Sequence, residues 1–167
     1  DGAPGSGRRF ADRVLFVPRW NRPQSPFRLH GDSYYVGVQG LSSILIRTTE
    51  GLILMDGGLP QSARLIEGNI RKLGFKIEDI KLIVNSHAHY DHAGGLAWLQ
   101  RASGAVVAAS PSGADGLTAG KPVKDDPQYG TDGMDGAFPR VANVRVIKDG
   151  EEVRLGQTTI TPHFTPG

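Results

Sequence analysis

Short apolar runs separated by glycine-containing turns dominate the first third of the chain. Residues 34–38, 43–47 and 52–55 are rich in aliphatic and aromatic side chains. Such runs, bounded by turn residues, are typical of β-strands, and short connections join strands that are antiparallel neighbours. The pattern therefore predicts an antiparallel meander of three strands between residues 34 and 55.

After this meander, the hydrophobic period changes to that of a helix. Across residues 61–73, apolar side chains recur at the spacing of one helix face, and Gly74 supplies a C-terminal stop. Residues 81–85 have an apolar centre and predict a buried strand. A helix around residues 93–101 and a second apolar strand at residues 105–109 are expected next, which together predict a β-α-β unit.

The last third of the chain begins with a stretch rich in Gly and Pro. Residues 110–140 predict a surface loop, a kind of segment that often carries functional groups. Three strand-like runs follow, at residues 143–148, 151–155 and 157–164, and Asp149-Gly150 is the expected hairpin turn. A meander followed by β-α-β units predicts an α/β fold in which helices cover at least one face of a sheet.

Composition narrows the class of protein. The 167 residues include 38% hydrophobic residues and no Cys, which describes a globular chain and excludes a disulfide scaffold, Cys-based zinc ribbons and thiol catalysis. The longest aliphatic run, residues 105–109, is far shorter than the roughly 20 residues that span a bilayer. We therefore expect no membrane partner.

Basic residues are concentrated near the N-terminus. Residues 1–28 contain six Arg and two Asp, a net charge of +4, which leaves 13 basic and 15 acidic residues elsewhere, a net charge of −2. We predict an Arg- and Pro-rich arm at residues 1–26 and one domain at residues 27–167. The arm has no regularly spaced aromatic side chains on which bases could stack, so we expect a solvated leader and no nucleic-acid partner. The absence of an initiating Met and of a signal-type apolar stretch indicates a processed start.

The segment His87-Ala88-His89-Tyr90-Asp91-His92 contains three of the chain's five His residues. Imidazole nitrogen and carboxylate oxygen are the ligands that zinc prefers in a chain without Cys. Because residues i and i+2 of an extended stretch share a side, His87 and His89 can bind one ion, and a following helix directs Asp91 and His92 to a second. Two ions about 3.5–4 Å apart would form a hydrolytic site. The alternative is a polar helix start whose side chains only cap the backbone.

Asp56 is a second candidate, at the end of an apolar strand. A buried carboxylate without partners would be costly, and a hydrogen bond to a metal-binding His would provide one. The alternative is an Asp-Gly turn exposed to water. His30 and His163 are isolated in strand-like surroundings, so we expect structural or surface roles for both.

These motifs resemble the metallo-β-lactamase superfamily. The segment from His87 to His92 is its signature, and Leu54-Met55-Asp56-Gly57-Gly58 is similar to its earlier Asp-bearing strand. Other segments resemble the third subclass of class B β-lactamases: Trp20-Asn21 with Pro26, and residues 56–61, 69–74 and 86–95. The resemblance extends from about Trp20 to Gly167. It implies the N-terminal half of an αββα sandwich, a mixed sheet with helices on one outer face.

The resemblance also implies a ligand set and a reaction. In that family, residues matching His87 and His89 bind one zinc ion, and residues matching Asp91 and His92 bind the second. A hydroxide held by the two zinc ions would attack the β-lactam amide, and Asp91 would be the catalytic residue that orients this nucleophile. The chain would then belong to an enzyme of β-lactam antibiotic resistance.

Substrate contacts and location are further implications. The glycine-rich loop would line the substrate groove, where we expect Tyr129 and Met134 to contact the β-lactam. Relatives of this kind imply a periplasmic or secreted location in bacteria.

The chain departs from the family pattern at its C-terminal end. The family carries a further zinc-binding His just after a Thr-Pro-Gly turn and another near the end of the fold, whereas this chain stops at Thr165-Pro166-Gly167. Each zinc ion would then have two ligands from this chain, although catalytic zinc normally has three. We therefore expect a proteolysed or truncated fragment, completed by a missing C-terminal half or by a second chain. We also expect its inner sheet face to be apolar and exposed.

Two alternatives to a β-lactamase remain open at this point. Another hydrolase of the same superfamily could act on thioesters, lactones or phosphodiesters, because the same metal motif activates water for each of them. A non-catalytic half-domain that binds metal weakly, as an assembly or a swapped dimer, is the second alternative.

Overall fold

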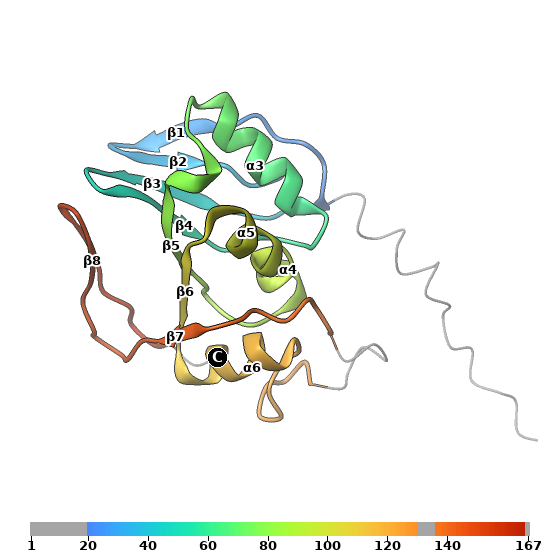
Figure 1. The fold of residues 1–167 in the computed structure, drawn as a ribbon. Helices are drawn as coiled ribbons and strands as arrows, with labels where there is room; N and C mark the ends of the chain where they lie inside the picture. The colour runs from blue at the N-terminus through green and yellow to red at the C-terminus, as the bar shows by residue number, and fades with distance from the viewer. Residues whose placement is uncertain (1–19, 130–135, 166–167) are drawn as a thin grey trace, which may run out of the picture.

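The structure is a computed structural model that describes residues 20–129 and 136–165 (Figure 1). Most of the predicted arm at residues 1–26, including residues 1–19, lies outside the described residues, so the division of the chain at that point stays a prediction. Seven strands form one sheet in the order of the chain: β1 (Phe27–His30), β2 (Ser33–Tyr35), β3 (Ile44–Thr48), β4 (Gly51–Met55), β5 (Ile80–Val84), β6 (Val106–Ala109) and β7 (Val144–Val146).

The sheet changes direction at its centre. Strands β1 to β4 pair antiparallel, and β4 to β7 pair parallel, which confirms both the predicted meander and the predicted β-α-β unit. The sheet is therefore mixed, as expected. One strand was missed: β1 has only two apolar residues, Phe27 and Leu29, and is exposed along its whole length. The predicted strand at residues 34–38 ends early, because β2 stops at Tyr35.

Helices cover one face of the sheet (Figure 1). The helix predicted at residues 61–73 is α3 (Ser62–Lys72), and the turn Ile77–Asp79 leads from it into β5. The helix predicted around residues 93–101 is two helices, α4 (Tyr90–Ala93) and α5 (Leu96–Ser103). Side chains from α3 and α5 pack with alternate residues of β4 and β5 into the main core, among them Ile66, Leu99, Leu54 and Ile83, all 0% exposed.

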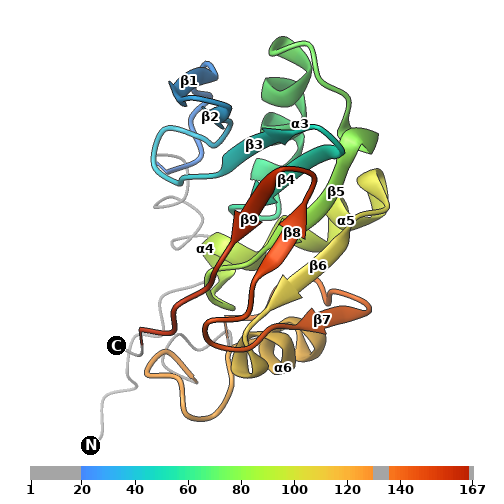
Figure 2. The same ribbon diagram turned by 90° about the vertical axis from the view of Figure 1, so that its left-hand side faces the viewer.

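A hairpin of two short strands, β8 (Val153–Leu155) and β9 (Thr158–Ile160), lies over the opposite face (Figure 2). Residues of the sheet that alternate with those of the main core, such as Ile53 and Ala108, are buried there against Val153. The expectation that this inner face would be exposed is therefore wrong for the central strands. The hairpin brings a few apolar side chains to the centre of the face, which is enough to remove Ile53 and Ala108 from water.

Two further predictions in the last third of the chain are wrong. Residues 110–140 were expected to form a loop, but they begin with the helix α6 (Pro111–Ala119). Ser110 caps this helix by accepting a hydrogen bond from the backbone N–H of Gly113 at 3.1 Å, and Pro111 suits the first helical turn. The glycines that suggested a loop are accommodated because the helix packs closely on its neighbours.

Asp149-Gly150 forms a turn, but it does not connect a hairpin. The strand before it, β7, pairs with β6 in the large sheet, whereas β8 after it pairs with β9. The hairpin turn lies instead between Leu155 and Thr158, where Gly156 adopts a left-handed φ of 55°. Among the described residues, none of the helices is long and apolar enough to cross a membrane.

Candidate metal centre

The candidate site lies where β5 ends and the chain turns into α4. Asn85 and Ser86 follow β5, and the segment from His87 to His92 connects them to the first turn of α4. Asp56 follows the neighbouring parallel strand β4. Carboxyl ends of parallel strands meet at one edge of a sheet, which is where α/β proteins place their ligands. Residues that are 30 positions apart in the chain are brought together in this way.

The three clustered imidazoles are in contact. The ring of His87 lies 4.4 Å from that of His89 and 4.1 Å from that of His92, measured between ring centres. His89 occupies the N-cap position of α4, but its side chain makes no capping hydrogen bond. The capping alternative is therefore wrong for His89, and the cluster needs another explanation.

Asp56 is buried, with 9% of its surface exposed, and is not a water-exposed turn. Its carboxylate accepts four hydrogen bonds: from Asn85 Nδ2 at 2.9 Å, the Ser86 backbone N–H at 2.8 Å, Ser86 Oγ at 2.7 Å and His92 Nδ1 at 2.9 Å. The backbone of Asp56 adopts a left-handed φ of 59°, which is uncommon for a residue with a side chain. Four hydrogen bonds to one buried carboxylate hold this strained turn and orient the ring of His92.

The contact with Asp56 occupies one nitrogen of His92 and leaves the other available. His92 Nε2 lies 3.6 Å from Asp91 Oδ2, a separation close to that of two ligands on one ion. The hydrogen bond to Asp56 raises the pKa of His92 above its usual value, against the opposing effect of burial. A carboxylate behind an imidazole increases the basicity of the ring as a ligand.

His87 has the opposite electrostatic environment. Burial lowers the pKa of His87 below its usual value, and the neighbouring His92 and His89 lower it further. Ser86 Oγ lies 3.0 Å from His87 Nδ1. Neutral imidazole is the form that binds a metal ion, so a lowered pKa keeps His87 ready for ligation at neutral pH.

His89 contacts a carboxylate that the sequence analysis did not single out. Asp126, in the segment after α6, lies with Oδ2 at 2.7 Å from His89 Nε2. The two residues are 37 positions apart, and no periodicity or motif connects them. The Asp125-Asp126 pair in the glycine-rich stretch was the available signal.

Of the two predicted substrate contacts, the structure describes Tyr129 alone. The side chain of Tyr129 is exposed, and its ring lies 5.8 Å from Lys121 Nζ. Met134 lies outside the described residues, and both substrate contacts stay predictions.

The donor set fits zinc in its chemistry. Three imidazoles and one carboxylate lie within one loop, and Asp56 leaves Nε2 of His92 facing Asp91. Across residues 20–129 and 136–165, however, no group of three or more His, Asp or Glu side chains is already gathered around one point. The cluster therefore has the ligand types of a zinc site, but in this structure the side chains do not converge on one point.

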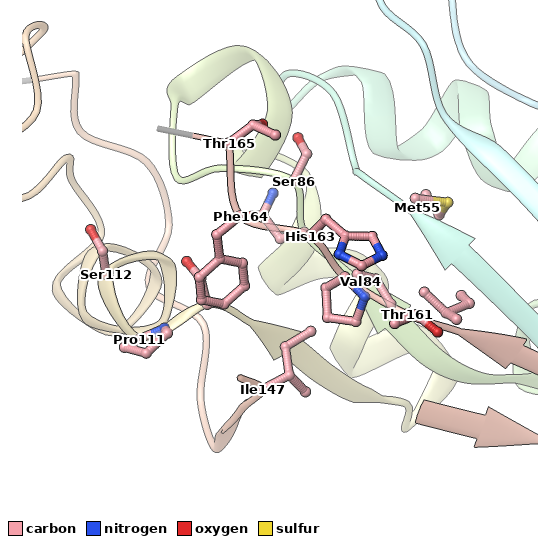
Figure 3. A pocket seen from close by; sticks show the side chains of 14 residues that line it. Met55, Val84, Ser86, Pro111, Ser112, Ile147, Thr161, His163, Phe164 and Thr165 are labelled. Carbon is pink, nitrogen blue, oxygen red and sulfur yellow. The ribbon is translucent and has the colours of Figure 1, made fainter. Parts of the chain in front are cut away.

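A pocket of about 770 Å³ includes Ser86, the residue before His87, in its wall (Figure 3). Its wall includes Met55 and Val84 at the ends of β4 and β5, and His163 and Phe164 from the segment after β9. Asn85 is 4% exposed and lines the pocket, and its Oδ1 has no hydrogen-bond partner among the described residues. His163 is thus part of the pocket wall, whereas His30 is exposed on β1.

Comparison with known proteins identifies relatives of this arrangement. A family model described as the metallo-β-lactamase superfamily matches residues 36–167. A subclass B3 metallo-β-lactamase isolated from a soil metagenome library is 54% identical with a TM-score of 0.85, over 89% of this chain and 55% of that one. The subclass B3 enzyme of Bradyrhizobium japonicum is 44% identical with a TM-score of 0.80, over 90% of this chain and 55% of that one.

A relative of different activity also matches. An N-acyl homoserine lactonase of Bacillus cereus is 36% identical over 74 residues, a match that covers 30% of this chain and 30% of the lactonase. The chain therefore spans about 55% of the length of the B3 structures and 30% of that of the lactonase.

Proposed function

Because this chain belongs to the metallo-β-lactamase superfamily, we propose that it carries the zinc-binding part of a hydrolase that opens the amide of β-lactam antibiotics. The observation that carries this proposal is the cluster of His87, His89 and His92 beside Asp91, supported from behind by the buried Asp56. Sequence identity of 54% to a subclass B3 structure supports the choice of substrate.

In this proposal, His87 and His89 hold one zinc ion, and Asp91 and His92 hold the second. Zinc, when bound, polarises the scissile carbonyl and lowers the pKa of water to near neutrality. Asp91 also has a proton-handling role: its carboxylate, which remains 31% exposed, accepts a hydrogen bond from the attacking water and so orients it. Asp56 fixes the ring of His92 so that Nε2 points toward Asp91.

The proposal includes further polypeptide at the pocket. Catalytic zinc normally has three protein ligands, and the pairs described above provide two for each ion. Asn85 Oδ1, which has no partner among the described residues, would accept a hydrogen bond from the additional segment. We propose that a C-terminal half or a second chain provides both the missing ligands and this donor.

A second candidate function is lactone hydrolysis. The specific observation in its favour is the 36% identity to the N-acyl homoserine lactonase. Lactones and β-lactams are both cyclic acyl compounds opened by water at a carbonyl, so one metal site can serve either reaction. The shorter match, 30% of each chain, makes this the second choice.

Zinc content and hydrolysis test these proposals together. We would measure zinc per polypeptide on protein of verified intact mass, then assay a carbapenem, a cephalosporin and an N-acyl homoserine lactone with and without a chelator. Chelator-sensitive cleavage of the β-lactams supports the first function, and cleavage of the lactone alone supports the second. Zinc-loaded protein that is completed by a C-terminal half or a second chain and still cleaves none of the three would overturn both and leave a non-catalytic half-domain.

A further inference from the structure

The contact between His89 and Asp126 joins the metal-binding loop to a distant segment. His89 Nε2 and Asp126 Oδ2 are 2.7 Å apart, and their side chains are only 17% and 22% exposed. A carboxylate can only accept a hydrogen bond, so the contact places the ring proton of neutral His89 on Nε2. The nitrogen left with a free lone pair is Nδ1.

The carboxylate of Asp126 is itself held in position. Asp126 Oδ1 accepts a hydrogen bond from the backbone N–H of Gln128 at 2.8 Å. The backbone N–H of Asp126 donates to the carbonyl of Val123 at 3.0 Å, and the N–H of Tyr129 donates to the carbonyl of Asp126 at 2.9 Å. These bonds form a compact turn whose geometry aims the carboxylate at His89.

The helix before this turn is packed directly on the metal-binding loop. A Cβ at Gly116 of α6 would lie 2.7 Å from the Cβ of Ala88, the residue between His87 and His89. The absence of a side chain at Gly116 thus permits close approach of the two backbones. The turn that carries Asp126 therefore starts from a fixed point beside His89.

Asp126 and Asp56 contact opposite nitrogens of their imidazoles. Asp56 binds Nδ1 of His92 and leaves Nε2, whereas Asp126 binds Nε2 of His89 and leaves Nδ1. The nitrogen that each ring offers is thus chosen by its carboxylate. Ring orientation and tautomer are set by such contacts in metal sites.

We infer that Asp126 is a positioning residue for the metal centre, which selects Nδ1 of His89 as its zinc-binding nitrogen. This inference rests on the proposed zinc site. It assigns a role in metal binding to the segment after α6.

The test compares Asp126→Asn with Asp125→Asn in the 167-residue chain. Asp125 is the adjacent, exposed carboxylate, so its replacement makes the same charge change. The affinity for zinc, measured by competition with a chromophoric chelator, is expected to fall about 10–100-fold in Asp126→Asn, as is typical for loss of such a partner. We expect less than a twofold change in Asp125→Asn.

A second readout needs no metal. Nitrogen-15 NMR of the metal-free chain at a pH where His89 is neutral reports its tautomer, which we expect to be Nε2–H. In Asp126→Asn, the population of the Nδ1–H form should increase, because the new amide can donate to Nε2. A role confined to packing would leave the tautomer unchanged.

The outcomes separate this inference from the proposed function. A wild-type chain with His89 protonated on Nδ1, or an Asp126→Asn variant with unchanged zinc affinity, would overturn the role of Asp126 while the zinc site stands. A wild-type chain that shows the Nε2–H tautomer but binds no zinc even when a C-terminal half or a second chain completes it would instead count against the proposed function and leave the positioning contact in place.

Discussion

Two carboxylates contact the clustered imidazoles, and they are held in very different ways. Asp56 is buried at the end of a central strand and accepts four hydrogen bonds, three of them from Asn85 and Ser86. Asp126 lies in a turn near the surface and is fixed mainly by backbone bonds of that turn. Both nevertheless make a hydrogen bond to one His at 2.7–2.9 Å.

The two carboxylates therefore have different roles: Asp56 supports both folding and the placement of a metal ligand, whereas Asp126 supports ligand placement. Asp56 joins the ends of β4 and β5, so the same hydrogen bonds that orient His92 also stabilise the sheet edge. Asp126 makes no comparable contribution to the main core, since its neighbours in the chain are exposed. We expect changes at Asp56 to alter stability and metal binding together, and changes at Asp126 to alter metal binding alone.

The largest expected effect on zinc binding comes from removing a metal-binding His that contacts one of the two carboxylates. His89→Ala removes the ring that Asp126 contacts, and His92→Ala removes the ring that Asp56 contacts. Each should weaken zinc binding by more than the roughly 10–100-fold expected for a supporting residue, and should abolish hydrolysis by the completed protein. Zinc titration and β-lactam turnover measure both, with His30→Ala on exposed β1 as the control. Normal turnover and zinc content in His89→Ala would refute the ligand assignment.

The next largest effect should distinguish the two carboxylates by stability. Asp56→Asn places an amide where a buried carboxylate accepted four hydrogen bonds, so at least one donor loses its partner. We expect a decrease of about 1–3 kcal/mol in the free energy of unfolding, measured by denaturant titration of the metal-free chain. Asn tolerates the left-handed φ of 59°, so backbone strain should not add to this value.

Asp126→Asn is the matched comparison, with an expected change within about 0.5 kcal/mol. An equal loss of stability in both variants would show that the turn after α6 contributes to folding as Asp56 does. The contrast between the two carboxylates would then be lost.

The side of the site that contains Asp56 could be predicted from sequence because its signals are local. An Asp that ends an apolar strand needs a partner, and three His within six residues provide one. The positions of β4 and β5 were predicted well because each strand is a short apolar run that can be recognised from the local sequence. The meander and the helix α3 were predicted for the same reason.

The side that contains Asp126 could not be predicted, because its signals are tertiary. Residues 110–119 contain glycines that lower helix propensity, and only packing against Ala88 shows why a glycine suits position 116. The contact of Asp126 with His89 depends on this packing. The hairpin of β8 and β9 was placed wrongly for a similar reason, since a sequence does not show which of two sheets a short strand will join.

A smaller effect should show how α6 supports the turn with Asp126. Gly116→Ala adds a Cβ at 2.7 Å from that of Ala88, whereas Gly68→Ala in α3 meets no atom within 4 Å. We expect Gly116→Ala to lower the unfolding free energy by about 1 kcal/mol, because overpacking outweighs the gain in helix propensity. Gly68→Ala should raise it by roughly 0.5–1 kcal/mol.

The same pair of glycine variants also tests the link to the metal centre. Gly116→Ala should weaken zinc binding, because a shift of α6 moves Asp126 relative to His89. Gly68→Ala should leave zinc binding unchanged. Increased stability in both variants would show that α6 can move without cost, and that its contact with Ala88 does not fix the turn.

The smallest predicted effect is a pair of opposite pH dependences in the metal-free chain. The hydrogen bond to Asp56 raises the pKa of His92 in the folded state, so His92 adds stability that is fully present below the unfolded value near 6.5 and is lost as the pH rises through the folded pKa. Burial lowers the pKa of His87, so its contribution is present above about 6.5 and is lost as the pH falls through its folded pKa. The two contributions oppose each other in the wild-type chain.

Removing one imidazole at a time should therefore reveal how the other one makes the unfolding free energy depend on pH. His92→Gln leaves the contribution of His87, so its unfolding free energy should decrease as the pH falls below about 6.5. His87→Gln leaves that of His92, so its unfolding free energy should decrease as the pH rises above about 6.5. Urea titrations with a chelator between about pH 5.5 and 8 measure both slopes around the His pKa. Slopes of the same sign would mean that Asp56 does not retain the proton on His92. The hydrogen bond to Asp56 would then orient the ring of His92 without changing its charge.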